Sequence, residues 1–233
     1  MRSFWALLRK EEMALFTSPI GYVMVSAFLV IMCYTFTLTL FLTHTPTLTH
    51  VFVQMYSLLL LTVPIITMRL VAEERRLRTL EMLLTSPVTE ASVVLAKFLA
   101  SMSLVLVMVL LSGAYALALA ALGAPDWGPI FSGYIGLLLL GAALVSVGLL
   151  TSALVNNQVI AALLSLSVFL LFWIIDYFGW LLPDPFNALF VNLSLLVHFR
   201  PFATGSLFLS DAGYFISVAL LGLFFSVRAL ARR

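Results

Sequence analysis

The sequence is poor in charge and carries very little lysine. Only 9% of its 233 residues are charged and 63% are hydrophobic, with a mean hydropathy of +1.16. A soluble domain has about 25% charged residues, so this chain cannot cover a water-exposed surface. The net charge of +2 provides no basic surface for nucleic acid. We therefore predict an all-α polytopic membrane protein.

Residues that could bind a nucleotide or a metal, or form a disulfide, are also scarce. A phosphate-binding loop needs a lysine followed by serine or threonine, but the only lysines, Lys10 and Lys97, precede Glu11 and Phe98. The single cysteine, Cys33, excludes a disulfide framework and a thiolate metal site. The three histidines lack metal-ligand spacing. We predict no catalytic residue, no metal site and no cofactor bound by this chain.

Long apolar runs account for most of the chain. A helix that crosses the hydrocarbon core needs about 20 mostly apolar residues. We predict six such helices, at residues 20–42, 51–71, 97–122, 130–154, 159–178 and 212–227. A charged loop at 72–96 separates the second from the third. Residues 179–211 are mixed in character, and their apolar stretch 186–197 is too short to span, so we predict a re-entrant or interfacial helix there.

Basic residues set the orientation of these spans, because they favour the cytoplasmic side. With both termini inside, Arg200 is the only basic residue on the outer side. The aspartates all lie outside, at Asp126, Asp176, Asp184 and Asp211. The basic residues inside are Arg2, Arg9, Lys10, Arg69, Arg75, Arg76, Arg78, Lys97, Arg228, Arg232 and Arg233. We therefore predict a multi-pass membrane protein with both termini on the cytoplasmic side.

The loop at 72–96 has the pattern of two helices joined by a sharp turn. Leucines at 77, 80 and 84 fall on one helical face. Pro87 ends that helix, and Thr89 then offers an N-cap for a helix that could run through Lys97 into the third span. By periodicity alone, the loop could equally lie in the lipid headgroups or dock into another protein.

Two other classes of function stay open at this point. An ion-coupled secondary transporter usually has ionisable side chains inside the membrane. Here Arg69, Lys97, Asp176 and Arg228 all fall near span ends, which disfavours that class. A membrane scaffold or enzyme would be indicated by a catalytic constellation, and the sequence shows none.

Residues 72–87 read AEERRLRTLEMLLTSP, with Lys97 ten residues further on. This stretch resembles a motif of the ABC-2 type transporter permeases, particularly the branch that resembles the gliding-motility permease. The resemblance extends to residues 8–11, 16–22 and 199–205, and thus over nearly the whole chain. It implies a location in the bacterial inner membrane. One departure is Arg78, where the family usually has glycine. The resemblance implies a type V exporter-like fold.

For function, the resemblance implies the non-catalytic permease subunit of an ATP-driven exporter. A separate ABC ATP-binding subunit would bind ATP and Mg, and residues 77–87 would form the coupling helix that docks into it. Residues 1–17 would form an interfacial elbow helix. The implied coupling residues are Glu73, Glu74, Arg75, Arg78, Thr79, Leu80, Glu81, Leu84, Ser86 and Pro87. The predicted membrane-interface anchors are Trp5, Arg9, Lys10 and Lys97.

Six transmembrane helices would line only half of a transport pathway. We therefore expect this permease to form a dimer with a second copy or a homologous chain. Membrane lipid and a periplasmic accessory protein are further predicted partners. Small residues of the fourth span would allow close helix packing, either between subunits or within one. These residues are Gly133, Gly136, Gly141, Ala142 and Gly148. The scarcity of charge favours a lipophilic or lipid-linked cargo, or mechanical work on a periplasmic partner.

Overall fold

The computed structural model describes residues 2–43, 47–79, 89–123, 125–181, 183 and 186–231. All regular elements of these residues are α-helices. The helices of the first half are α1 (Arg2–Phe16), α2 (Pro19–Thr43), α3 (Thr49–Thr67), α4 (Ala72–Arg76) and α6 (Glu90–Leu122). Those of the second half are α7 (Trp127–Leu154), α8 (Gln158–Leu181), α9 (Phe186–Leu193), α10 (Leu195–Thr204) and α11 (Leu209–Ala231).

The prediction of six membrane-spanning helices is confirmed. Helices α2, α3, α6, α7, α8 and α11 are long and apolar enough to cross a bilayer. The third of them starts at Glu90, because the Thr89 hydroxyl accepts a hydrogen bond from the Ser92 backbone N–H at 3.3 Å. Its 33 residues therefore form one continuous helix from the charged loop through Lys97.

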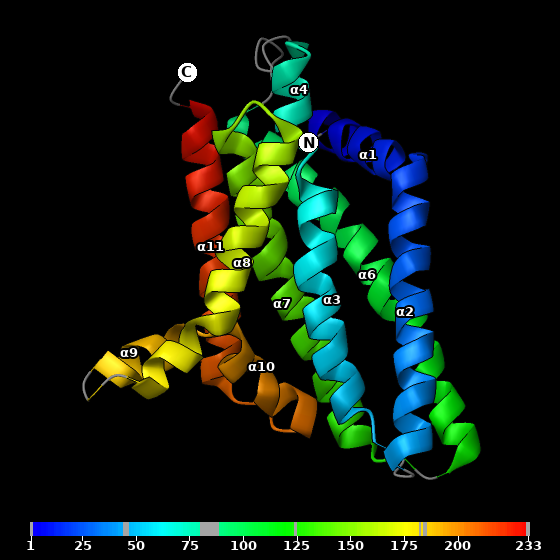
Figure 1. Cartoon of the computed structure of the whole chain (residues 1–233). Coiled ribbons are helices and arrows are strands. Elements are labelled where there is room, and N and C mark those ends of the chain that lie inside the picture. The colour runs from blue at the N-terminus through cyan, green and yellow to red at the C-terminus, as the bar shows by residue number, and fades with distance from the viewer. Residues whose placement is uncertain are drawn as a thin grey trace.

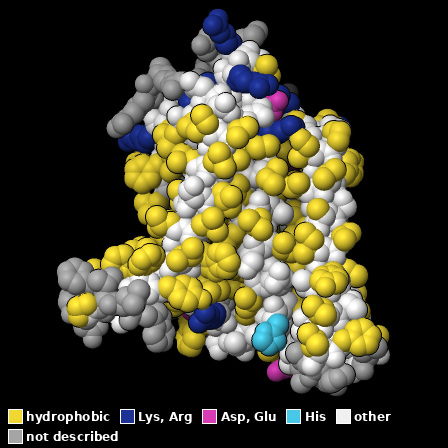
Figure 2. Space-filling view, in the orientation of Figure 1, with side chains coloured by type: hydrophobic (Ala, Val, Ile, Leu, Met, Phe, Trp, Pro, Cys, Tyr) yellow, Lys and Arg dark blue, Asp and Glu magenta, His cyan; other side chains and the backbone are white. Residues whose placement is uncertain are grey.

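Helix α7 lies at the centre of the bundle and packs on α3, α6, α8, α10 and α11. Both chain ends and α4 lie at one end of the bundle, where α1 crosses it at a steep angle to α2 (Figure 1). Figure 2 shows a broad band of hydrophobic side chains around the middle and most of the visible lysines and arginines at the α4 end. This division of the surface matches a bilayer around the middle of the bundle.

The predicted small residues of α7 pack within this chain. A Cβ atom on Gly133 would lie 2.5 Å from the Phe52 ring, and one on Gly136 would lie 2.5 Å from Phe202 Cβ. At Gly141 the nearest atom would be Val105 Cγ1, at 2.9 Å, and at Gly148 it would be the Thr67 hydroxyl. Ala142 is half-buried. These contacts favour packing between helices of one subunit over a dimer surface.

Gly136 is therefore a sensitive position. We expect Gly136→Ala to lower the free energy of unfolding by about 1–3 kcal/mol, because Phe202 Cβ belongs to a buried side chain that cannot withdraw. Gly113→Ala is the matched control, since its Cβ would meet nothing within 4 Å. Thermal unfolding in detergent measures both variants. Equal stability of the two would contradict this account of α7 packing.

The segment 179–211 differs from the prediction of one short helix over 186–197. It contains two helices that break at Ser194, where the side chain accepts from the Val197 N–H at 3.4 Å and so starts a new helix. Helix α10 then continues to Thr204 and buries Phe199 and Phe202 against the bundle. Figure 1 shows α9 projecting away from the spans at the end opposite α4.

Candidate functional site

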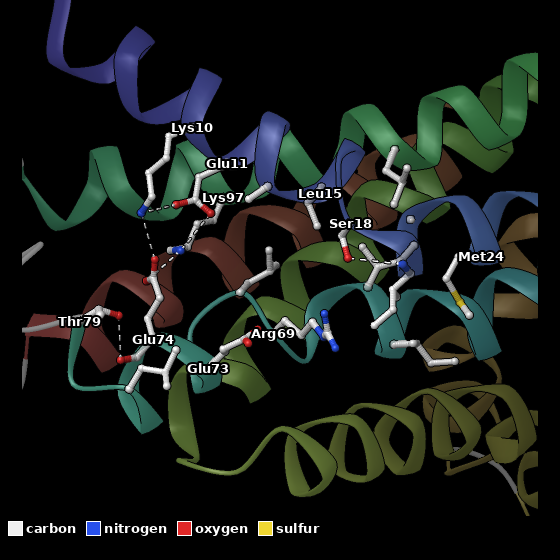
Figure 3. A pocket seen from close by; sticks show the side chains of 18 residues that line it. Lys10, Glu11, Leu15, Ser18, Met24, Arg69, Glu73, Glu74, Thr79 and Lys97 are labelled. Atoms are coloured by element: carbon white, nitrogen blue, oxygen red, sulfur yellow. Dashed lines mark hydrogen bonds and ion pairs between the residues drawn. The ribbon is translucent and has the colours of Figure 1, made fainter.

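A cluster of four charged residues joins α1, α4 and α6 at the α4 end of the bundle (Figure 3). Lys97 Nζ lies 2.9 Å from Glu74 Oε2 and 3.2 Å from Glu11 Oε2. Lys10 Nζ lies 3.5 Å from both Glu11 Oε1 and Glu74 Oε1. Two ammonium groups thus face two carboxylates, and the cluster is electrically neutral. We call these four residues the ion-pair cluster.

The sequence places these side chains together through two apolar helix faces. On α1, Leu7 and Leu8 are buried and Glu11 follows one turn later on the same face. On α6, Val93 and Val94 are buried one turn before Lys97. These two apolar faces pack together with the ends of α7 and α11 and form a second hydrophobic core. Packing of the two faces places Glu11 and Lys97 inside the protein.

Burial makes the pairing obligatory for Lys97. Its side chain is 1% exposed, whereas that of Lys10 is 59% exposed. Moving an ammonium group out of water costs several kcal/mol unless a carboxylate lies against it. Two carboxylates lie against the Lys97 ammonium. Each carboxylate is paired with an ammonium, so the cluster can hold three helices together but offers no free base for catalysis.

The connection between α3 and α4 is fixed to α7 by a second set of bonds. The Ser152 hydroxyl accepts from the backbone N–H groups of Val71 and Ala72, at 3.2 and 3.1 Å, and donates to the Met68 carbonyl at 3.1 Å. Val71 at the N-cap of α4 makes no side-chain cap of its own. Ser152 therefore supplies from α7 the acceptor that the start of α4 lacks.

Of the predicted coupling residues, Glu73, Glu74 and Arg75 all belong to α4. Glu74 is held in the ion-pair cluster. Arg75 donates from Nη1 to the Ala153 carbonyl at 2.6 Å, which adds a further bond between α4 and α7. Glu73 is half-buried and lines a cavity beside α1. For Glu73, a contact with a second polypeptide stays a prediction.

The rest of the predicted coupling helix begins with exposed residues. Leu77 is 59% exposed, and Arg78 and Thr79 are exposed beside it. Arg78 has φ of 58°, a left-handed conformation that glycine adopts more readily than any residue with a Cβ. The family's usual glycine at this position matches that geometry. Five other predicted coupling residues lie outside the described residues, namely Leu80, Glu81, Leu84, Ser86 and Pro87.

The predicted interface anchors fall into two groups. Trp5, Arg9 and Lys10 are exposed along α1, as an interfacial helix requires. Lys97 is different, because α1 covers it and the ion-pair cluster holds it inside the protein. The structure thus corrects the prediction that Lys97 lies at the membrane surface. A lysine near a span end resembles an anchor in sequence, and only tertiary packing buries this one.

A cavity of about 350 Å³ adjoins the ion-pair cluster, between α1, α2, α3, α4 and α6 (Figure 3). The cluster residues and Glu73 line one part of it. Arg69 also lines it, and the Arg69 Nε is buried with no hydrogen-bond partner among the residues that the structure describes. Apolar side chains from α1, α2, α3 and α6 form most of the remaining wall.

At the opposite end of the bundle lies a hydrogen bond between a histidine and an aspartate that sequence reasoning missed. His198 Nδ1 lies 2.7 Å from Asp211 Oδ1, and its ring stacks on Tyr214 with centroids 4.0 Å apart. The sequence analysis found only that the three histidines lack metal-ligand spacing. A histidine on the polar side of α10, near the acidic first turn of α11, was the only signal in the sequence.

Comparison with known proteins identifies the chain. The sequence profile of the family described as "ABC-2 family transporter protein" matches residues 43–227. The match includes Glu74 and Lys97 of the ion-pair cluster and leaves out Lys10 and Glu11. A comparison with curated proteins finds no match. Because the profile covers well over half of the chain, this protein belongs to the ABC-2 transporter family and is an ABC transporter permease.

Proposed function

We propose that this permease is driven by ATP hydrolysis in a separate ABC ATP-binding subunit and works as an exporter. The observation that carries the proposal is the double attachment of α4. Ion pairs join it to α1 and α6, and Ser152 and Arg75 join it to α7. A push on the exposed residues 77–79 would therefore reach three helices at once.

The direction of that push follows from the family resemblance of residues 72–87. Closure of two ATPase subunits would press on the coupling segment of each permease copy. Helix α6 continues without a break from Glu90 into the membrane, so displacement of its first turns would move the whole span. Two permease copies, identical or homologous, would line the pathway. The outward direction rests on the resemblance to exporters.

The arrangement of charge supports the orientation in the bacterial inner membrane. Described basic residues of α1, α4 and the end of α11 gather at one end of the bundle, together with both chain ends. This is the cytoplasmic end under the positive-inside rule, and it is the end an ATPase can reach. A periplasmic partner would meet α9 and α10 at the other end.

The test is co-purification of the tagged permease with ABC ATP-binding subunits from its own cells, identified by mass spectrometry. We expect the parent protein to retain the ATPase and both Glu81→Arg and the double variant Leu80→Asp with Leu84→Asp to lose most of it. Glu90→Arg is the matched control, because it makes the same charge change at an exposed position just beyond the motif. Size-exclusion chromatography checks that every variant is folded.

Two outcomes would contradict the proposal. One is that the folded parent retains no ATPase. The other is that the ATPase stays bound to the loop variants as firmly as to Glu90→Arg. Ion-driven uptake by the protein in liposomes would then become the next measurement.

A further inference from the structure

The cavity beside the ion-pair cluster has one charged part and one apolar part. Lys10, Glu11, Glu74 and Lys97 neutralise one another at its charged part. Two charged groups remain there, the guanidinium of Arg69 and the carboxylate of Glu73. Neither forms an ion pair with any other residue that the structure describes. In Figure 3 the Arg69 side chain extends away from the cluster, on the side of Ser18.

The position of Arg69 calls for a polar partner. Its Nε is shielded from solvent and makes no hydrogen bond within the described part of the chain. A buried donor without an acceptor destabilises a fold, and the penalty is larger for a charged group. An anionic oxygen in the cavity would remove that penalty. Because Glu73 lines the same cavity, a ligand with a cation beside its anion would satisfy both groups.

The apolar part of the cavity excludes a purely hydrophilic ligand. Leu15 from α1 and Met24 from α2 face Ile65 from α3 and Leu104 from α6. Leu104 lies well inside the long α6 span and Met24 lies beyond the first turn of α2, so this wall extends into the membrane. A volume of about 350 Å³ holds a small headgroup and the start of an acyl chain.

We propose that the cavity binds a phospholipid with an ethanolamine headgroup, taken from the leaflet at the α4 end. The lipid phosphate accepts hydrogen bonds from Arg69, and its ammonium donates to Glu73. One acyl chain follows the apolar wall and leaves the cavity into the bilayer. The bound lipid thereby bridges the α1–α2 bend and the α3–α4 connection.

The headgroup choice follows from the neutral charge balance of the lining. Phosphatidylglycerol would bring a phosphate for Arg69 but no cation for Glu73. Phosphatidylcholine would bring a cation, but its trimethylated nitrogen has no N–H to donate. Ethanolamine alone satisfies both residues. The site does not depend on the proposed coupling to an ATPase, so a failure of either proposal leaves the other standing.

Native mass spectrometry of the purified, delipidated full-length permease tests the site. The three phospholipids, matched in acyl chains, are added at equal concentration. We expect the parent to retain phosphatidylethanolamine at least about tenfold more than either competitor, as one charge-assisted hydrogen bond predicts. Arg69→Gln should lose retention of all three. Glu73→Gln should abolish only the preference for ethanolamine.

Arg76→Gln is the matched control, because it removes an arginine from an exposed position of α4 and should bind like the parent. Soluble phosphoethanolamine, added in excess, should not displace the lipid, since it lacks the acyl chain. Equal retention of the three lipids by the parent would overturn the proposal. So would retention by Arg69→Gln, an unchanged preference in Glu73→Gln, or displacement by phosphoethanolamine.

Discussion

Replacing Lys97 with methionine is expected to lower the free energy of unfolding by about 3–5 kcal/mol, the largest effect of any single change we predict. Methionine matches the length of the lysine stem and fills the same space. It leaves the carboxylates of Glu11 and Glu74 with only the exposed ammonium of Lys10 as a partner. The destabilisation comes from two largely buried negative charges that have lost their buried cation.

A triple variant separates lost charge balance from lost packing. Lys97→Met combined with Glu11→Gln and Glu74→Gln removes both carboxylates along with the ammonium. Because a buried ion pair replaced as a whole is often neutral for stability, we expect the triple variant to regain most of the loss. Arg9→Met, at an exposed position of α1, should leave the unfolding temperature unchanged.

Thermal unfolding in detergent at neutral pH measures the parent and all three variants. If Lys97→Met were as stable as the parent, the ion-pair cluster would contribute nothing and the attachment of α1 to α6 would rest on apolar contacts alone. If the triple variant were no more stable than Lys97→Met, the loss would come from packing around the methionine.

Much of the fold was predictable because lipid imposes simple length and polarity rules. Each span is a long apolar run, and the break between the fourth and fifth spans lies at Asn157, whose side chain accepts a backbone hydrogen bond. Thr89 was recognised as an N-cap from its position between Pro87 and the apolar run. Signals of this kind are local in sequence, and local signals specify where helices begin and end.

The ion-pair cluster was not predicted, because its partners are distant in the chain. Lys97 and Glu11 are 86 residues apart and meet only when α1 folds across α6. The sequence did contain one indication, since each charged residue shares a helical face with buried apolar residues. A charged residue on the apolar face of a helix either pairs with an opposite charge inside the protein or lies at the protein surface. The sequence pattern is the same in both cases.

The sequence also left open whether the α7 glycines pack within one subunit or between two. A stripe of small residues fits packing within one subunit as well as packing between two. In the structure, bulky groups of this chain fill the space, Phe52 against Gly133 and Phe202 against Gly136. A role of these residues in a dimer stays a prediction. Phe202 lies on α10, a helix whose start at Ser194 the sequence analysis did not place.

Ser152→Ala is expected to lower the free energy of unfolding by about 2–4 kcal/mol, although it removes a single oxygen atom. The hydroxyl serves three backbone groups, the N–H of Val71, the N–H of Ala72 and the carbonyl of Met68. Val71 and Ala72 are fully buried, so water cannot replace the lost acceptor. The first turn of α4 should therefore open.

Ser103→Ala provides the control for this change. Among the residues that the structure describes, the Ser103 hydroxyl bonds only the Ala100 carbonyl of its own helix, so its loss should alter stability little. Hydrogen exchange gives the local readout. In Ser152→Ala the amides of residues 68–77 should exchange faster, while those of the α6 span keep their protection. Unchanged exchange in that segment would show that the contacts of Arg75 and Glu74 hold α4 without Ser152. Faster exchange would instead establish that Ser152 of α7 fixes the start of α4.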